Sequence, residues 1–128
     1  MSVIIRKAQK GDMPAIHGLV RELAIYEKAE EEFVVTIEEY ERDFEDQAFE
    51  ALLAEVEGQV VGMVLFYMTY STWKGRMLYL EDFMVTAKCR QQGIGDLLWD
   101  QLLKEAKQRG VKANASLTKA EILSRLKA

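Results

Sequence analysis

Apolar residues along the chain recur with two different periods, and these periods predict where strands and helices form. A short β-branched run, Val3 to Arg6, favours a strand that ends near Lys7. Two further apolar runs, Glu50 to Val56 and Gln59 to Tyr70, are separated by Glu57-Gly58, a typical two-residue hairpin turn. We therefore expect these two runs to pair as antiparallel strands.

The longest apolar run, Met77 to Val85, follows a loop over Ser71 to Gly75. It is rich in aliphatic and aromatic residues, as a strand covered on both faces would be. We therefore expect this segment at the centre of the sheet.

Helical spacing begins after Asp12, which we expect to cap a helix with Pro14 in its first turn and an end near Tyr26. The apolar residues of this helix recur every three or four positions: Ile16, Leu19, Val20, Leu23 and Ala24. Thr36, followed three residues later by Glu39, forms a capping box and predicts a shorter second helix.

A third helix is predicted from Gly93 to Arg109, with Gly110 as its stop. Its expected buried face carries Ile94, Leu97, Leu98, Leu102, Leu103 and Ala106. The resulting order is strand, helix, helix, three strands, helix. This order indicates an α/β protein with a mixed, mostly antiparallel sheet flanked by helices, and 128 residues fit one domain.

Composition narrows the class of protein. A net charge of −4 argues against nucleic-acid binding, which needs Lys and Arg to neutralise phosphates. Ten acidic residues crowd positions 27–46, where they form either a solvated surface or an attractive site for a cation. The single cysteine, Cys89, and the single histidine, His17, argue against a disulfide and a structural metal site. Without a signal peptide or a membrane span, we expect a cytoplasmic protein with no membrane partner.

A glycine-containing turn joins the central strand to the third helix, with the sequence Arg90-Gln91-Gln92-Gly93-Ile94-Gly95. The start of a helix presents unpaired N–H groups and the positive end of the helix dipole, and glycine lets an anion approach the backbone. Arg90 adds a positive charge. The turn therefore favours phosphate binding, although two glycines before a helix also serve simple turn formation.

This Arg-x-x-Gly-x-Gly turn between a strand and a helix resembles the signature of the GNAT acetyltransferases, whose loop holds the pyrophosphate of acetyl-coenzyme A (acetyl-CoA). Three other segments resemble the spermidine/spermine (diamine) acetyltransferases in particular: Glu22 to Glu27, Tyr70 to Gly75 and Leu78 to Val85. Four separated matches in the right order are more specific than any one motif. The resemblance covers about residues 2 to 112.

The resemblance implies that acetyl-CoA is the cosubstrate, and it indicates which residues bind it. These residues are Phe83, Met84, Val85, Arg90, Gln91, Gln92, Gly93, Ile94, Gly95 and Asp96. The backbone N–H groups of Phe83 and Val85 are the expected contacts to the acetyl carbonyl and the pantetheine arm.

The resemblance also implies that Glu81 is the catalytic base, with Asp82 beside it, because an amine must lose a proton before it attacks a thioester. Successive strand residues point to opposite faces, so this pair shares a pocket only if a β-bulge intervenes. GNAT proteins are known for such a bulge. A structural ion pair is the alternative role for these carboxylates.

For the acceptor amine, the resemblance implies a site made by Tyr26, Glu27, Trp73 and Glu81. An acidic and aromatic channel suits a flexible polycation. Simpler roles stay open, with Trp73 covering the core and Glu27 a solvated acid. The leading hypothesis is N-acetylation of a polyamine or another small primary amine. The alternatives are an acetyl-CoA-binding module that has lost catalysis and an acidic protein-binding domain without a cofactor.

The match ends after the third helix, so we divide the chain into an incomplete acetyltransferase core, 1–112, and a divergent helical tail, 113–128. The resemblance implies a further strand and then a helix that carries a catalytic tyrosine, and we expect neither here. Thr118 and Glu121 instead form a capping box, which predicts a new short helix. A core without its final strands leaves an open sheet edge, which favours a homodimer.

Overall fold

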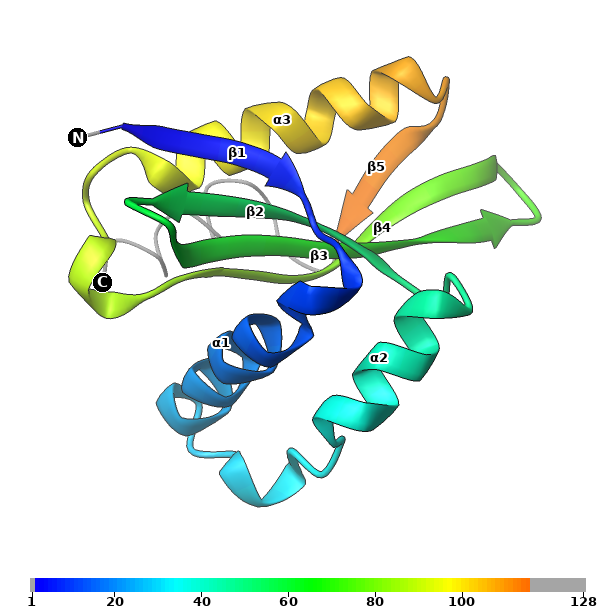
Figure 1. Cartoon of the computed structure of the whole chain (residues 1–128). Coiled ribbons are helices and arrows are strands. Elements are labelled where there is room, and N and C mark those ends of the chain that lie inside the picture. The colour runs from blue at the N-terminus through cyan, green and yellow to red at the C-terminus, as the bar shows by residue number, and fades with distance from the viewer. Residues whose placement is uncertain (1, 116–128) are drawn as a thin grey trace.

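The computed structural model describes residues 2–115 (Figure 1). The strands are β1 (Val3–Lys7), β2 (Glu50–Val56), β3 (Gln59–Ser71), β4 (Gly75–Val85) and β5 (Lys112–Ala115). The helices are α1 (Met13–Tyr26), α2 (Ile37–Glu45) and α3 (Ile94–Gln108), with short 3₁₀ turns η1 (Lys10–Asp12), η2 (Glu30–Glu32) and η3 (Ala87–Cys89). The predicted order of helices and strands is confirmed as far as α3.

The five strands form one sheet in the order β1-β2-β3-β4-β5. The first three pairings are antiparallel and the last, between β4 and β5, is parallel. Helices α1 and α2 cover one face of the sheet and α3 covers the other (Figure 1). The predicted α/β class with a mixed, mostly antiparallel sheet is confirmed, but β3 rather than β4 is the middle strand.

Strand β5 corrects the expectation that no strand follows the third helix. Residues Lys112–Ala115 pair in parallel with Met77–Leu80 of β4. The sequence Lys-Ala-Asn-Ala has little β propensity, so it resembles a turn when taken alone. Its strand conformation comes from pairing with the free backbone groups along the edge of β4. The helix expected from Thr118 lies outside the described residues.

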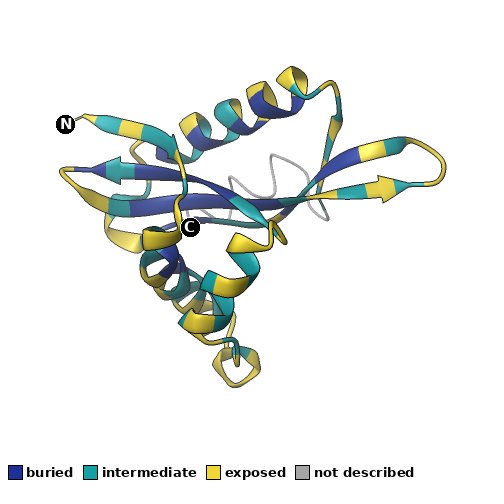
Figure 2. Cartoon of the chain, turned by 45° about the vertical axis from the view of Figure 1, so that its right-hand side comes forward, coloured by how far each residue is buried: buried dark blue, intermediate teal, exposed yellow. Residues whose placement is uncertain are grey.

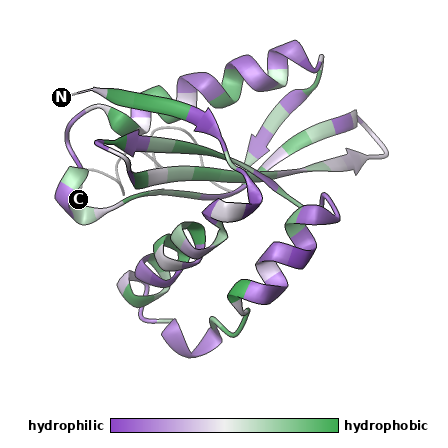
Figure 3. Cartoon of the chain, in the orientation of Figure 1, coloured by the Kyte–Doolittle hydropathy of each residue, from purple (hydrophilic) through white to green (hydrophobic). Residues whose placement is uncertain are grey.

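The sheet separates two apolar cores. The core under α3 includes Leu52, Val64, Phe66, Leu78, Leu98 and Leu102. The core under α1 and α2 includes Met13, Ile16, Leu53, Met63, Leu65 and Met84. Buried residues run along β2, β3 and the sheet side of α3 (Figure 2). The ribbon of η2 and α2 is mostly hydrophilic, as the acidic segment requires (Figure 3).

The helices agree with their sequence patterns except along one face. The capping box is confirmed, because Thr36 Oγ1 accepts the Glu39 N–H at 3.1 Å and Glu39 Oε1 accepts the Thr36 N–H at 3.3 Å. In α3, however, Leu97 and Leu103 are 46% and 43% exposed. At about 100° per residue they lie about 120° to either side of the middle of the buried stripe. That stripe is narrower than expected and contains Ile94, Leu98, Leu102, Glu105 and Ala106.

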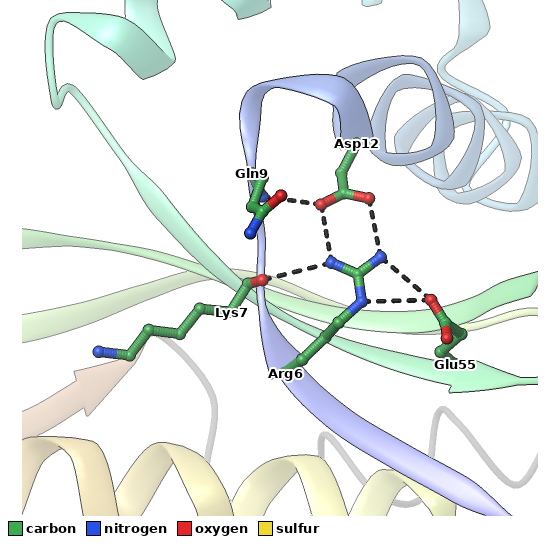
Figure 4. Close-up of polar contacts among 5 residues, drawn as sticks. All are labelled: Arg6, Lys7, Gln9, Asp12 and Glu55. Carbon is green, nitrogen blue, oxygen red and sulfur yellow. Dashed lines mark hydrogen bonds and ion pairs between the residues drawn. The ribbon is translucent and has the colours of Figure 1, made fainter. Parts of the chain in front are cut away.

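Arg6 ties β1 and β2 to the start of α1 (Figure 4). Its guanidinium donates to both carboxylate oxygens of Asp12 at 2.8 and 2.9 Å, and to Glu55 at 3.2 Å. Asp12 also accepts the backbone N–H of Gln9 at 2.7 Å. The side chain of Asp12 therefore does not cap α1, contrary to the prediction, because the charged guanidinium and the turn hold its carboxylate.

The hairpin between β3 and β4 is longer than predicted. The strands continue to Ser71 and resume at Gly75, so the expected five-residue loop is a tighter turn. Ser71 Oγ accepts the backbone N–H groups of Trp73 at 3.2 Å and Lys74 at 3.0 Å. These hydrogen bonds give the N–H groups of the turn a local acceptor, and the pairing of β3 with β4 continues up to the turn, beyond the apolar runs of the sequence.

Candidate active site

A β-bulge in β4 produces the central feature of the site. Leu65 of β3 pairs with Asp82, whereas Phe66 pairs with Leu80, so Glu81 is an extra residue between two pairs. A bulge shifts the alternation of side chains by one position. Glu81 and Asp82 therefore lie on the same face of the sheet, the one that α1 and α2 cover. The bulge that the resemblance implied is present.

Contacts on both sides of the bulge agree with this placement. Glu81 is exposed, and its Oε1 accepts the hydroxyl of Tyr67 at 3.4 Å. Asp82 lies against the α2 side, where its charge acts on Tyr40. The next residue, Phe83, returns to the opposite face and packs against the α3 core.

Asp82 has the most strongly perturbed carboxyl group of the site. Burial raises the pKa of Asp82 to about 6, and the negative charges of Glu81 and Glu27 act in the same direction. Burial, together with the charge of Asp82, raises the pKa of Tyr40 to about 12. A carboxylate with a pKa near 6 can accept a proton close to neutral pH and release it again.

The backbone of β4 beyond the bulge offers N–H groups on the side away from β3. Thr86 donates its N–H to Val61 O at 2.8 Å, and alternation along an antiparallel ladder makes Met84 face β3 in the same way. The N–H groups of Phe83 and Val85 consequently point toward the β5 side. Within residues 2–115, β5 pairs with Met77–Leu80 and does not reach these two residues. Their position is suitable for the predicted contacts to the acetyl carbonyl and the pantetheine arm.

The glycine turn lies at the start of α3, as predicted. Gly93 is the N-cap and has φ +80, a left-handed conformation that favours glycine. A Cβ added at Gly93 would meet nothing within 4 Å, so the space beside it is open. The N–H groups of Ile94, Gly95 and Asp96 belong to the first helical turn, where N–H groups have no partner within the helix. The turn thus fits a pyrophosphate, and Asp96 can contribute through its N–H, since its carboxylate would repel a phosphate.

The side chain of Arg90 is directed toward α1. Its Nε donates to Val85 O at 2.9 Å, and its guanidinium lies 5.7 Å from the ring centroid of Tyr26. Glu22 Oε2 lies 4.0 Å from Arg90 Nη2. Only 14% of the Arg90 side chain is exposed. The guanidinium therefore braces the loop against α1, and its contact with a phosphate stays a prediction.

The residues predicted to bind the amine are only partly brought together. Tyr26 ends α1, and the charge of Glu27 reaches Asp82, so this corner adjoins the bulge. Trp73 lies in the hairpin turn and is 93% exposed. The stretch of β4 from Gly75 to Glu81 corresponds to about 20 Å along a strand. In one chain, Trp73 does not join the carboxylate pair.

Sequence reasoning assigned no role to three polar residues around the site: Glu22, Tyr40 and Tyr67. Glu22 lies in a segment that supported the resemblance, and its spacing from the loop gives no sign of contact. Tyr40 follows two acids on a surface helix and looks solvated in the sequence. The packing of α1 and α2 on the sheet brings Glu22 and Tyr40 to the site, whereas Tyr67 reaches Glu81 from the neighbouring strand β3. Only the folded chain reveals that these three residues lie close to the site.

Residues 2–115 contain no group of three or more His, Cys, Asp or Glu side chains that could hold a metal ion. Cys89 is a free thiol that packs against the α3 core. In the same described part of the chain, no helix has the length and apolar character needed to cross a membrane.

The geometry fits a protein that binds an acyl-coenzyme A along β4 and delivers the acyl group to an amine. The Acetyltransferase (GNAT) family model matches residues 14–121. The chain therefore belongs to the GNAT acetyltransferase family. It is an N-acetyltransferase with acetyl-CoA as its cosubstrate.

Named relatives are similar to the chain at different coverage. Bovine (Bos taurus) thialysine N-epsilon-acetyltransferase is 40% identical over 118 residues, which span 84% of this chain and 69% of that protein. Human (Homo sapiens) spermidine/spermine N(1)-acetyltransferase-like protein 1 is 41% identical over 100 residues, 71% of this chain but only 14% of that protein. The solved structure of a ribosomal-protein-alanine N-acetyltransferase from Brucella melitensis biovar Abortus 2308 has a TM-score of 0.77 at 25% identity, and the match covers 99% of this chain and 92% of that one.

Proposed function

We propose that this protein transfers an acetyl group from acetyl-CoA to a primary amine of a small cationic substrate, either a polyamine or an aminoalkyl amino acid such as thialysine. The observation that carries the proposal is the bulge in β4, which puts Glu81 and Asp82 on one face beside the end of α1. Two adjacent acids there can attract an ammonium group and remove its proton. The name of the bovine relative supports the aminoalkyl alternative.

Proton removal is the first task of the site, because an alkylammonium with a pKa of about 10.4 is almost fully protonated at neutral pH. We assign Glu81 as the base that takes this proton directly or through water, since its carboxylate is exposed to an incoming substrate. Asp82 serves as a second proton acceptor on the same face, helped by its raised pKa. The neutral amine nitrogen then has a free electron pair to attack the thioester carbonyl carbon.

Stabilisation of the developing negative charge is the second task. The N–H groups of Phe83 and Val85 point away from β3, where they can donate to the carbonyl oxygen and the pantetheine arm. The N–C bond forms as the C–S bond breaks, and the departing sulfur takes the electron pair of the C–S bond. The sulfur also takes, directly or through water, the proton that the attacking nitrogen then loses, so the products are the amide and the free thiol of coenzyme A. The first turn of α3 and Gly93 hold the pyrophosphate.

The acidic end of α1 supports a cationic substrate. Tyr26 is 55% exposed, and the charge of Glu27 acts on Asp82. An amine with a second positive charge would therefore meet an aromatic ring and an acid next to the reacting nitrogen.

We also propose a cytoplasmic homodimer. Exposed Tyr70 and Trp73 at the β3–β4 hairpin support an apolar contact with a second copy.

A thiol-release assay with spermidine and with thialysine tests the proposal. We expect Glu81→Gln and Asp82→Asn each to reduce turnover by about 10²-fold or more, the scale of general-base catalysis. Glu57→Gln removes a similar charge from the exposed β2–β3 turn and is the matched control. Wild-type turnover in both site variants would refute the assignment of the base, and absence of thiol release with every small amine would refute the substrate class.

A further inference from the structure

Glu22 makes a set of contacts that the proposed reaction does not use. Its Oε1 accepts the hydroxyl of Thr86 at 2.8 Å, and its Oε2 accepts the backbone N–H of Ala87 at 3.1 Å. The same Oε2 lies 4.0 Å from Nη2 of Arg90. These partners follow Glu22 by more than sixty residues, so one carboxylate of α1 fastens the segment that leaves β4.

We propose that Glu22 is a positioning residue that holds the coenzyme loop, defined here as residues 86–95, against α1 and thereby sets the affinity of the protein for coenzyme A. This inference rests on the proposed function, because it takes the loop to be the pyrophosphate site. Glu22 does not touch the reacting atoms in this account.

The hydrogen bonds of Glu22 end at the start of the coenzyme loop, where the chain leaves β4 and turns away from the sheet. Thr86 also donates its backbone N–H to Val61 O, which marks the last rung of the β3–β4 ladder. The chain turns immediately afterwards through η3 toward Gly93. A carboxylate that binds both the Thr86 hydroxyl and the Ala87 N–H fixes this turn with two hydrogen bonds to a charged acceptor, which are stronger than neutral ones.

Arg90 links Glu22 to the proposed site of the pantetheine arm. Its Nε donates to the carbonyl of Val85, and the N–H and C=O of a strand residue point the same way. Arg90 therefore lies on the side of β4 where the N–H of Val85 is proposed to meet the pantetheine arm. At 4.0 Å, Glu22 acts on this partly buried cation through charge rather than through a short hydrogen bond.

The same cluster adjoins the proposed amine site. Tyr26 lies one helical turn after Glu22, and its ring lies under the Arg90 guanidinium. The last turn of α1 and the coenzyme loop thus share one cluster of three side chains. A change at Glu22 should disturb the loop first, because the hydrogen bonds of Glu22 end there and not at Tyr26.

The test compares Glu22→Gln with Glu30→Gln. The glutamine side chain in Glu22→Gln would keep one acceptor oxygen for two donors and would lose the charge that faces Arg90. Glu30 pairs with Arg21 on the surface, where both side chains are at least half exposed, so its replacement removes the same charge without touching the loop. Calorimetric titration of the full chain with coenzyme A gives the dissociation constant. Amide hydrogen exchange of the coenzyme-free protein reports on Ala87.

We expect Glu22→Gln to raise the dissociation constant for coenzyme A about tenfold, the scale of one charged hydrogen bond. Exchange at Ala87 should accelerate, while Glu30→Gln changes neither quantity. Thr86→Val removes one donor to the same carboxylate, so its effect should add less than fully to that of Glu22→Gln.

Unchanged affinity in Glu22→Gln, or an equal loss in Glu30→Gln, would overturn the inference. If Glu22→Gln does not fold, Thr86→Val alone decides: wild-type affinity together with wild-type exchange at Ala87 would overturn it. A wild-type chain that fails to bind coenzyme A would overturn the proposed function itself. Binding by the wild type with no response to these variants would overturn only the role of Glu22.

Discussion

Replacing Asp82 by Asn should stabilise the folded protein at pH 7.5 while it reduces turnover. The pKa of Asp82 is raised from 3.8 to about 6 mainly by burial, with further contributions from Glu81 and Glu27. At pH 7.5 the carboxyl is ionised in both the folded and unfolded states, so the folded protein bears the unfavourable energy of that charge. Asn keeps the shape of the side chain and removes the charge.

The size of the effect follows from the pKa. A rise from 3.8 to about 6 corresponds to about 3 kcal/mol between the two protonation states. Asp82 is not fully buried, and solvent screening reduces the destabilisation caused by its charge to about 1–2 kcal/mol. For a domain of this size that is about 4–8 °C in melting temperature.

The dependence on pH has a definite sign. The folded-state pKa of Asp82 lies above its unfolded value, so its cost is present above pH 6 and is relieved as the pH falls toward 4. The advantage of Asp82→Asn should therefore shrink between pH 7.5 and pH 5. Thermal melts of both proteins at the two pH values measure this, with the exposed Asp100→Asn as a control that should shift little.

Destabilisation of the folded protein by Asp82→Asn would contradict the proposed role of Asp82. A loss of more than about 1 kcal/mol in Asp82→Asn at pH 7.5 would mean that the carboxylate is a structural partner. The reasoning from burial would then be wrong, and the ion-pair alternative would stand.

Two further predictions concern the loop and the assembly. Gly93→Val forces a β-branched residue into φ +80 and fills the space beside the loop, so we expect at least about tenfold weaker binding of coenzyme A by calorimetry; Glu81→Gln should keep that affinity and lose turnover. Equal loss of affinity in both variants would contradict this division of roles. Trp73→Ala should shift the proposed homodimer toward monomer in light scattering, because it removes the most exposed aromatic side chain of the hairpin. A monomeric wild-type chain would refute the homodimer.

The local sequence determined most of the secondary structure. The turn at Glu57-Gly58 and the capping box at Thr36 depend on neighbouring residues, and both are present where expected. The glycine turn before α3 is also local, since Gly93 adopts a left-handed conformation that other residues rarely take. Such features are set by backbone sterics and short hydrogen bonds, which a sequence pattern expresses directly.

The sequence also identified the carboxylate pair but could not place it. Adjacent strand residues point to opposite faces, and the extra residue at Glu81 follows from how β3 and β4 pair across their register. No property of Glu81 or Asp82 alone indicates a bulge, and the resemblance had to imply it. Burial of Asp82 under α1 and α2, which raises its pKa, is likewise a result of packing.

Long-range contacts decided what remained. Strand β5 forms because β4 offers a free edge, although Lys112–Ala115 has little strand propensity of its own. Glu22 reaches the coenzyme loop because α1 packs beside the end of β4, across more than sixty residues of sequence. Trp73 stays apart from Glu81 because the hairpin is long: the stretch of β4 from Gly75 to Glu81 alone corresponds to about 20 Å, although both residues belong to segments that match one family. A sequence pattern fixes the chemistry each residue can perform, whereas the distances between distant residues depend on the register and packing that only the folded chain establishes.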